Sequence, residues 1–312
     1  MARNADKLYY PLRQAIESVL PIVDEFVVAI GKGDEGDRTR EIVASIDSDK
    51  VKIIDTVWDI GKYPRGMEHA HQTDLAKARC KGDWLIYLQA DEVIHEKDLD
   101  NIKEACFIYL NDKEVEGFLL RYRHFWGDYA HYHRSHGWYP YEIRIIRNDP
   151  DIHSWESAQS FRRIPNFDGL SYRQKENTFK LKVLKVDAEI YHYGWVRPPD
   201  LMDRKNKAFQ TIHQGEKETG TGEEAPEEFI PFDYGPLNRL EVFKGTHPKV
   251  MNEWISRFDW KDQLQYRGRP KNKKRKKPRH ERMKNRLFTV LKYNILNMPT
   301  LGEFNNYRML RR

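Results

Sequence analysis

Short apolar segments alternate with amphipathic segments along the first third of this chain. Strand-like runs occupy residues 26–30, 51–55 and 84–88. The stretches between them, about 38–46 and 69–81, have the spacing of helices. Parallel strands need a long crossover connection, usually a helix, so this order indicates right-handed strand–helix–strand units. The alternation predicts an α/β fold with a mainly parallel central sheet covered by helices on both faces.

The third of these strands ends in a pair of carboxylates. The run at 84–88 is followed by Gln89 and Ala90, and then by Asp91 and Glu92. In open α/β sheets, ligands bind outside the carboxyl ends of the strands. Carboxylate oxygens at such an end suit a divalent cation that is shared with substrate phosphates. The alternative interpretation is a strand that runs into a solvated acidic turn.

Charge is distributed unevenly along the chain. Residues 266–312 carry 16 Lys and Arg and two acidic residues, a net charge of +14, and the whole chain carries +6, so the remainder carries −8. The run at 271–280 is too charged to enter a core, whereas 287–296 has the pattern of a short amphipathic helix. This pattern is equally compatible with a tail that docks on an anionic bilayer and with a solvated tail that has no fixed partner. Nucleic acid is a weaker third choice because few aromatic residues lie among the basic ones.

The expected compartment follows from what the sequence lacks. No window approaches the roughly 20 consecutive apolar residues that a membrane span needs. Residues 1–6 lack the apolar stretch of a secretory signal. The two cysteines, Cys80 and Cys106, suit free thiols in a reducing compartment. We expect a cytoplasmic protein that the basic tail can hold at the inner face of the membrane.

The chain divides into three parts by composition. The alternation of strands and helices continues to about residue 215, and the stretch that follows is rich in Gly, Glu, Pro and Thr, which is typical of a surface loop. Apolar residues within 243–260 predict a small helical cap. We therefore expect a main domain over 1–215, a loop and cap over 216–265, and a basic tail over 266–312.

The order of these motifs resembles that of a family 2 glycosyltransferase with the GT-A nucleotide-sugar-binding fold. The resemblance covers about residues 4–215. Its most specific pieces are the strand end at Asp91 and the downstream His192-Tyr193-Gly194. Weaker pieces are Arg3-Asn4 with its following helix and the loop from Gly31 to Thr39. The resemblance implies an α/β/α sandwich with a mainly parallel, partly mixed sheet, to which a C-terminal helical and basic extension is added.

The resemblance also implies an activity. Such enzymes move a sugar, here expected to be a hexose, from a nucleoside diphosphate sugar to a glycan or lipid-linked acceptor in polysaccharide synthesis. They hold Mn²⁺ or Mg²⁺ on the donor diphosphate through an Asp-x-Asp type motif. Here Gln89 occupies the first acidic position, which leaves Asp91 as the expected metal ligand and Gln89 as a neutral contact to the donor. His192 matches a histidine near the diphosphate and is the second expected ligand.

Two further roles are implied by the same resemblance. The glycine-rich loop after the first strand matches a turn that positions the nucleotide, so Asp34 is expected to contact the donor and Asp37 to cap the following helix. An inverting transferase needs a carboxylate that removes the proton of the acceptor hydroxyl. The family places this base after the strand that contains Arg144 and Arg147, which here falls near residues 158–160, so Glu156 would serve as the base from a shifted position.

Other interpretations stay open. A noncatalytic relative that binds a nucleotide or a partner would explain Gln89, and a nucleic-acid-binding protein could act through the basic tail. The segment 121–138 is dense in aromatic rings and imidazoles, which suits stacking on a sugar. Its histidines could instead bind zinc, although the segment has no Cys and no helical pair of ligands. These histidines are His131, His133 and His136.

Overall fold

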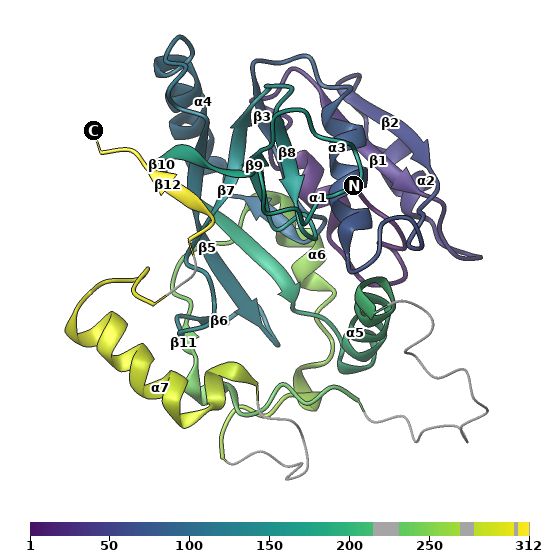
Figure 1. Cartoon of the computed structure of the whole chain (residues 1–312). Helices are drawn as coiled ribbons and strands as arrows, with labels where there is room; N and C mark the ends of the chain where they lie inside the picture. The colour runs from purple at the N-terminus through teal and green to yellow at the C-terminus, as the bar shows by residue number, and fades with distance from the viewer. Residues whose placement is uncertain (215–230, 269–277, 303–304, 312) are drawn as a thin grey trace.

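The structure, a computed structural model of the whole chain, describes residues 1–214, 231–268, 278–302 and 305–311 (Figure 1). Its architecture is mixed α/β. The described residues form a two-stranded sheet and a ten-stranded sheet. Part of the predicted surface loop and most of the basic run lie outside the described residues.

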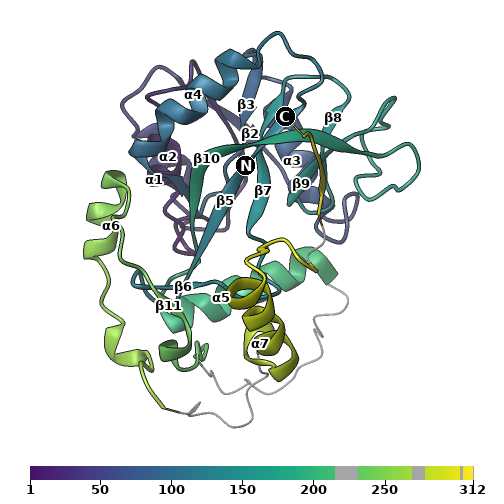
Figure 2. The same ribbon diagram turned by 90° about the vertical axis from the view of Figure 1, so that its left-hand side faces the viewer.

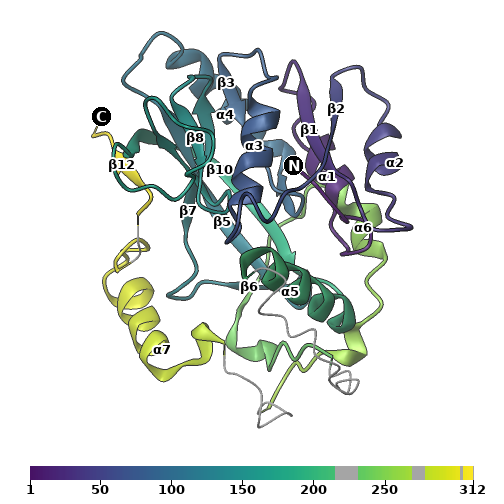
Figure 3. The same ribbon diagram turned by 45° about the vertical axis from the view of Figure 1, so that its right-hand side comes forward.

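The two-stranded sheet contains the predicted strand–helix–strand unit. Strands β1 (Phe26–Gly31) and β2 (Val51–Thr56) pair in parallel, and α2 (Thr39–Ala44) connects them. Figure 3 shows α2 on the outer side of this pair. On the other edge of β1, Ala2 forms a parallel bridge with Ile30. Because β1 and β2 are parallel, their carboxyl ends lie at the same end of the sheet.

Two long strands form the centre of the ten-stranded sheet. Strand β5 (Gly117–Trp126) runs parallel to β10 (Phe179–Trp195), side by side through the middle of the molecule (Figures 1 and 2). The C-terminal strand β12 (Tyr307–Met309) also pairs in parallel with β10. The basic tail thus ends as a strand of the main sheet.

The prediction of a mainly parallel sheet is wrong, because the large sheet is mostly antiparallel. Strand β3 pairs with β7 in antiparallel fashion, and so do β4 with β10 and β5 with both β6 and β7. No helix lies between β5 and β10 along the chain, and several strands there, such as β5 with β6 and β8 with β9, pair in antiparallel fashion with the strand that follows them. The remaining strands are β3 (Trp84–Ile86), β4 (Glu92–Ile94), β6 (His131–His133), β7 (Tyr141–Arg147), β8 (Ile152–Trp155), β9 (Ser160–Arg163) and β11 (Glu241–Val242).

Helices cover the sheets and extend from them. The α-helices not yet given are α1 (Leu12–Glu17), α3 (Met67–Lys77), α4 (Leu99–Ile108), α5 (Pro199–Gln214), α6 (Asn252–Ser256) and α7 (Met283–Val290). A π-helical turn, Leu291–Ile295, continues α7. Short 3-10 helices lie at Glu96–Asp98, Leu237–Arg239, Lys249–Met251, Lys261–Gln263 and Arg279–Glu281. Within the described ranges, no helix has the length and apolar character that a membrane crossing requires.

The predicted helical cap packs into the core of the main domain. Met251 and Trp260 are almost fully buried and belong to one apolar cluster with Phe125 and Tyr193 of the central strands. The indole Nε1 of Trp260 donates a hydrogen bond of 2.9 Å to the carbonyl oxygen of Gly127. The cap therefore covers the ends of β5 and β10.

Candidate functional site

Strand pairing brings the carboxylate of Asp91 to the imidazole of His192. The chain leaves β3, turns, and enters β4 at Glu92, which stands opposite His192 in the antiparallel register of β4 and β10. The backbone N–H of Tyr193 donates to the carbonyl oxygen of Asp91 at 2.8 Å. Asp91 and His192 are both buried. The two most specific pieces of the predicted motif, the strand end at Asp91 and the segment that begins at His192, thus lie side by side.

Glu92, the neighbouring carboxylate, has a structural role. The guanidinium of Arg144 donates from Nε and Nη2 to its two oxygens at 2.8 and 2.9 Å. The hydroxyl of Tyr122 donates to the same carboxylate at 2.7 Å, and the backbone N–H of Gln89 does so at 3.1 Å. Glu92 is fully buried. These bonds hold the turn that carries Asp91.

His192 is neutral, and the free electron pair of its Nε2 faces Asp91. His124 Nε2 donates to the carbonyl oxygen of Tyr139 at 2.9 Å, which leaves Nδ1 of the neutral His124 ring as an acceptor. His192 Nδ1 lies 3.0 Å from that atom and carries the proton. Burial lowers the pKa of both imidazoles, which keeps them uncharged. The free Nε2 of His192 is 3.8 Å from Asp91 Oδ2.

This pair fits a divalent cation that is shared with a substrate. A carboxylate oxygen and an imidazole nitrogen that face each other repel unless a positive charge lies between them. An imidazole ligand beside a carboxylate favours Mn²⁺ over Mg²⁺. In the part of the chain that the structure describes, no group of three or more His, Cys, Asp or Glu side chains is arranged to hold a metal. An ion at Asp91 and His192 therefore needs further oxygen ligands, which the phosphates of a substrate can supply.

Two cationic side chains lie beside the same carboxylate. Lys205 Nζ, from α5, is 3.7 Å from Asp91 Oδ2 and donates to the carbonyl oxygen of Gly194 at 2.6 Å. Burial opposes ionisation of Asp91, but nearby positive charge, including that of Lys205 and Arg197, holds the pKa of its carboxyl below the usual range. Asp91 is therefore ionised and surrounded by groups of positive or neutral charge.

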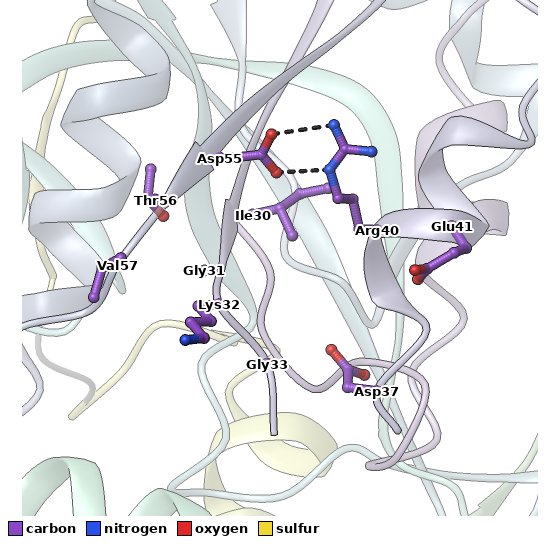
Figure 4. A pocket seen from close by; sticks show the side chains of 10 residues that line it. All are labelled: Ile30, Gly31, Lys32, Gly33, Asp37, Arg40, Glu41, Asp55, Thr56 and Val57. Carbon is purple, nitrogen blue, oxygen red and sulfur yellow. Dashed lines mark hydrogen bonds and ion pairs between the residues drawn. The ribbon is translucent and has the colours of Figure 1, made fainter. Parts of the chain in front are cut away.

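A hollow of about 440 Å³ opens at the carboxyl ends of β1 and β2. Figure 4 shows Arg40 and Asp55 at its wall, joined by two hydrogen bonds of 2.8 and 3.1 Å. Its size is that of a small-ligand site, and its position is where open α/β sheets bind ligands. The lining residues are Ile30, Gly31, Lys32, Gly33, Asp37, Arg40, Glu41, Asp55, Thr56 and Val57.

Of the two acidic residues predicted in this loop, only Asp37 lines the hollow. Asp34 is tied instead to the N-terminal segment, where its carboxylate accepts from Arg3 Nη2 at 3.2 Å and from Asn4 Nδ2 at 2.9 Å. The expectation that Asp37 caps α2 is wrong. Arg38 occupies the N-cap position, and no side chain makes a capping hydrogen bond there. Asp37 accepts instead from the hydroxyl of Thr39 at 2.8 Å.

The N-terminal segment runs from the hollow to the buried side chains around Asp91. Asn4 contacts the loop at the hollow through Asp34, and a few residues later the carbonyl oxygen of Leu8 accepts from Arg197 Nη1 at 2.6 Å. The ring of Tyr10 lies under the Arg197 guanidinium, 4.6 Å from centroid to Cζ. A ligand that extends from the hollow toward Asp91 would follow this segment.

Two predicted residues remain, Gln89 and Glu156. Gln89 contacts the turn between β8 and β9, and Glu156 belongs to that turn. Gln89 Nε2 donates to the carbonyl oxygen of Ala158 at 3.2 Å, so this turn lies against the strand end. Glu156 belongs to the turn, is 37% exposed, and lies 3.7 Å from Arg173 Nη2. Glu156 is thus an accessible carboxylate near Gln89, and its role as the base stays a prediction.

The histidines considered for zinc are used separately. His131 Nδ1 bonds to the carboxylate of Asp128 at 2.9 Å, whereas His133 stacks on the indole of Trp138 with 4.3 Å between centroids. The backbone N–H of His136 donates to Thr289 Oγ1. These three imidazoles belong to no metal-binding group among the described residues.

Sequence reasoning missed several charged or titratable residues around Asp91. His124, Arg197 and Lys205 all lie far from it in the chain: His124 belongs to the aromatic segment 121–138, Arg197 closely follows the His192 motif, and Lys205 had no local signal. Glu142 was also missed. It is buried, and its oxygens accept from Ser160 Oγ at 2.9 Å and from the side-chain amide of Asn306 at 3.2 Å.

Comparison with known proteins adds no family assignment. No protein-family model matches this chain, and no curated protein sequence matches it. The function is therefore argued from the geometry of the site.

Proposed function

We propose that this protein is a GT-A type glycosyltransferase that moves a sugar from a nucleoside diphosphate sugar to a glycan or lipid-linked acceptor. The observation that carries the proposal is the approach of His192 Nε2 to 3.8 Å from Asp91 Oδ2 at a strand end. The hollow at the ends of β1 and β2 supports it, because a nucleoside there can extend its diphosphate along the N-terminal segment toward this pair. The main sheet is mostly antiparallel, but β1 and β2 form a separate parallel pair, so their carboxyl ends still lie together at the hollow.

Asp91 and His192 would hold the divalent cation of such an enzyme. When bound, Mn²⁺ or Mg²⁺ supplies positive charge to the donor diphosphate. His124 fixes the tautomer and the ring orientation of His192, as the outer partners of metal-binding histidines do. Arg144 and Glu92 hold the turn, so the Asp91 carboxylate is positioned before any ligand arrives.

The proposed reaction is an inverting displacement. The acceptor hydroxyl oxygen forms a bond to the anomeric carbon while the bond from that carbon to the phosphate oxygen breaks, and its electrons stay on the departing nucleoside diphosphate. A carboxylate takes the hydroxyl proton. Glu156 is the accessible candidate for this role, since both oxygens of the buried Glu142 already accept hydrogen bonds.

A panel of nucleoside diphosphate sugars, tested with Mn²⁺ present, examines the proposal directly. We expect one donor to bind and to be hydrolysed slowly in the absence of acceptor. Asp91→Asn preserves the size of the side chain and should lower this turnover at least 100-fold, by analogy with the loss of other charge-stabilising groups. If no donor binds or is hydrolysed, the proposal fails. If turnover is the same in Asp91→Asn, a noncatalytic nucleotide-binding role for the strand end is favoured.

The exposed face of α7 supports an acceptor at a membrane. Arg282, Lys284 and Arg286 are exposed on the same segment as a set of exposed apolar side chains. Figures 1 and 3 show α7 at the edge of the molecule, away from β1 and β2. An amphipathic helix with basic residues suits an anionic bilayer, at about 1 kcal/mol per Lys or Arg. We infer docking at the cytoplasmic face of a membrane. The exposed apolar residues are Met283, Leu287, Val290, Leu291, Ile295, Leu296 and Met298.

A further inference from the structure

Arg197 is a buried cation whose hydrogen-bond donors are only partly paired with acceptors of the protein. It is fully buried, and its Nη1 donates to the carbonyl oxygen of Leu8. Its Nε and Nη2 have no hydrogen-bond partner among the described residues. Leaving a buried charged donor without an acceptor costs free energy, so such groups are rare unless something else binds them. The unpartnered Nε and Nη2 of Arg197 point to an anionic ligand that binds there.

Lys205 brings a second cation to the same place. Arg197 and Lys205 share the ring of Tyr10, at 4.6 Å from Cζ and 5.5 Å from Nζ to the centroid. The Lys205 side chain is 14% exposed. The two cations exceed the one carboxylate, so this part of the site has an unbalanced positive charge.

The chemistry of these groups matches a diphosphate. A guanidinium presents its N–H groups as a planar fork that fits phosphate oxygens, and a lysine ammonium binds phosphate as a point charge. Both lie beside Asp91, next to the segment that leads to the hollow at β1 and β2. A nucleoside in that hollow would direct its diphosphate toward these two side chains.

We propose that Lys205 and Arg197 bind the donor diphosphate and stabilise the negative charge of the departing nucleoside diphosphate. This inference rests on the proposed function, and it adds two diphosphate-binding residues to the pair that would hold the metal. In the transfer step the electrons of the broken bond move onto the phosphate oxygen, where both cations become more strongly attracted. Because that attraction grows in the transition state, Lys205 should affect kcat as well as binding.

Lys207 provides a matched control on the same helix. Its side chain is 62% exposed and its Nζ pairs with Asp203 at 3.1 Å. Lys205→Met and Lys207→Met each remove one ammonium from α5 and keep most of the unbranched side chain. Calorimetric titration of the full chain with a panel of nucleoside diphosphates, in EDTA and then in Mn²⁺, compares the two variants with the unmodified protein.

We expect Lys205→Met to weaken nucleoside diphosphate binding at least 10-fold in EDTA, and Lys207→Met to bind as the unmodified protein does. With an active donor, Lys205→Met should lower kcat 100-fold or more, in the range seen when one charge-stabilising donor is removed. Arg197→Lys keeps a charge but loses the fork, and should weaken binding while the thermal unfolding temperature shows whether it folds. Equal binding and equal kcat in Lys205→Met and the unmodified protein would overturn the inference.

Inorganic pyrophosphate separates this inference from the proposed function. If no nucleoside diphosphate sugar is turned over but pyrophosphate still binds and Lys205→Met weakens it, the diphosphate site stands and the transferase does not. If a sugar is transferred at the same rate by Lys205→Met, the transferase stands and the two cations have another role. If neither pyrophosphate nor any nucleoside diphosphate binds the unmodified protein, the inference is wrong.

Discussion

The Nδ1 atoms of His124 and His192 lie 3.0 Å apart, and this contact sets which nitrogen of His192 is free. Since His124 Nε2 already donates to the carbonyl oxygen of Tyr139, the proton between the two rings belongs to His192. The bond directs the free Nε2 of His192 toward Asp91. A residue 68 positions away in the chain thus orients the nitrogen that faces Asp91.

His124→Phe tests this relationship. Loss of the acceptor should free the His192 ring to rotate or change tautomer, and Mn²⁺ affinity should fall 10- to 100-fold, as for other outer partners of metal-binding histidines. Mn²⁺ binding in the presence of a nucleoside diphosphate, followed by electron paramagnetic resonance, measures it. His124→Asn places an amide near the former Nδ1 and should restore part of the affinity. An affinity in His124→Phe equal to that of the unmodified protein would mean that the bond between the two histidines does not affect Mn²⁺ binding.

Gly194 should tolerate no side chain. A Cβ atom at this position would lie 2.5 Å from His192 Nε2 and 2.6 Å from Asp91 Oδ2, so both groups would have to move. Misplacement of about 1 Å can lower a rate about 100-fold, and we expect that loss of turnover in Gly194→Ala. Gly61→Ala is the control, because its Cβ would meet its nearest neighbour at an ordinary 3.5 Å. Activity in Gly194→Ala equal to that of the control would contradict the packing described.

Arg144→Met should destabilise the fold. The variant leaves the Glu92 carboxylate buried without its partner, which typically costs about 3–5 kcal/mol. Adding Glu92→Gln removes the unpaired charge and keeps an oxygen for the Tyr122 hydroxyl, so the double variant should recover part of the loss. Urea unfolding of both proteins measures the difference. A double variant that is no more stable than Arg144→Met would show that the charge of Glu92 is not the source of the cost.

Acid should destabilise the cap through His247. Its Nε2 bonds to the carbonyl oxygen of Tyr129 at 2.9 Å and its Nδ1 to the Tyr193 hydroxyl at 2.8 Å, and burial lowers its pKa to about 4. Between that value and the ordinary 6.5 the unfolded chain binds a proton that the folded chain does not, so stability is lost as pH falls. We expect about 2 kcal/mol between pH 7 and pH 5. Thermal unfolding across this range should show a weaker pH dependence in His247→Gln.

Removing apolar side chains from α7 and its π-helical turn should release the protein from anionic vesicles. Leu287 and Ile295 are each 68% exposed, so replacing both by Ser changes little in the folded core. In flotation with phosphatidylglycerol vesicles, we expect the unmodified protein to float and the double variant to float at least 10-fold less. Phe107→Ser on α4 removes an apolar group that is 80% exposed elsewhere on the surface and serves as the control. Equal flotation of all three proteins would argue against docking through α7.

The sequence alone determined the local elements and one end of the site. Apolar periodicity located β1, α2 and β2, and the run that ends at Asp91 became a strand followed by a turn. These features depend on neighbouring residues, which is why spacing along the chain suffices to predict them. The motif also led to His192, the residue that the fold places beside Asp91.

Only the tertiary structure decided the direction of the strands and the rest of the site. Strand orientation depends on which distant segments form backbone hydrogen bonds, and periodicity within one strand contains no record of its neighbour. Arg144 illustrates the point for side chains: the sequence marks it as part of a strand, but only the pairing of β3 with β7 brings it to Glu92. Likewise Lys205 comes to Asp91 from a separate helix, because side chains that meet in a folded core need not be close in the chain.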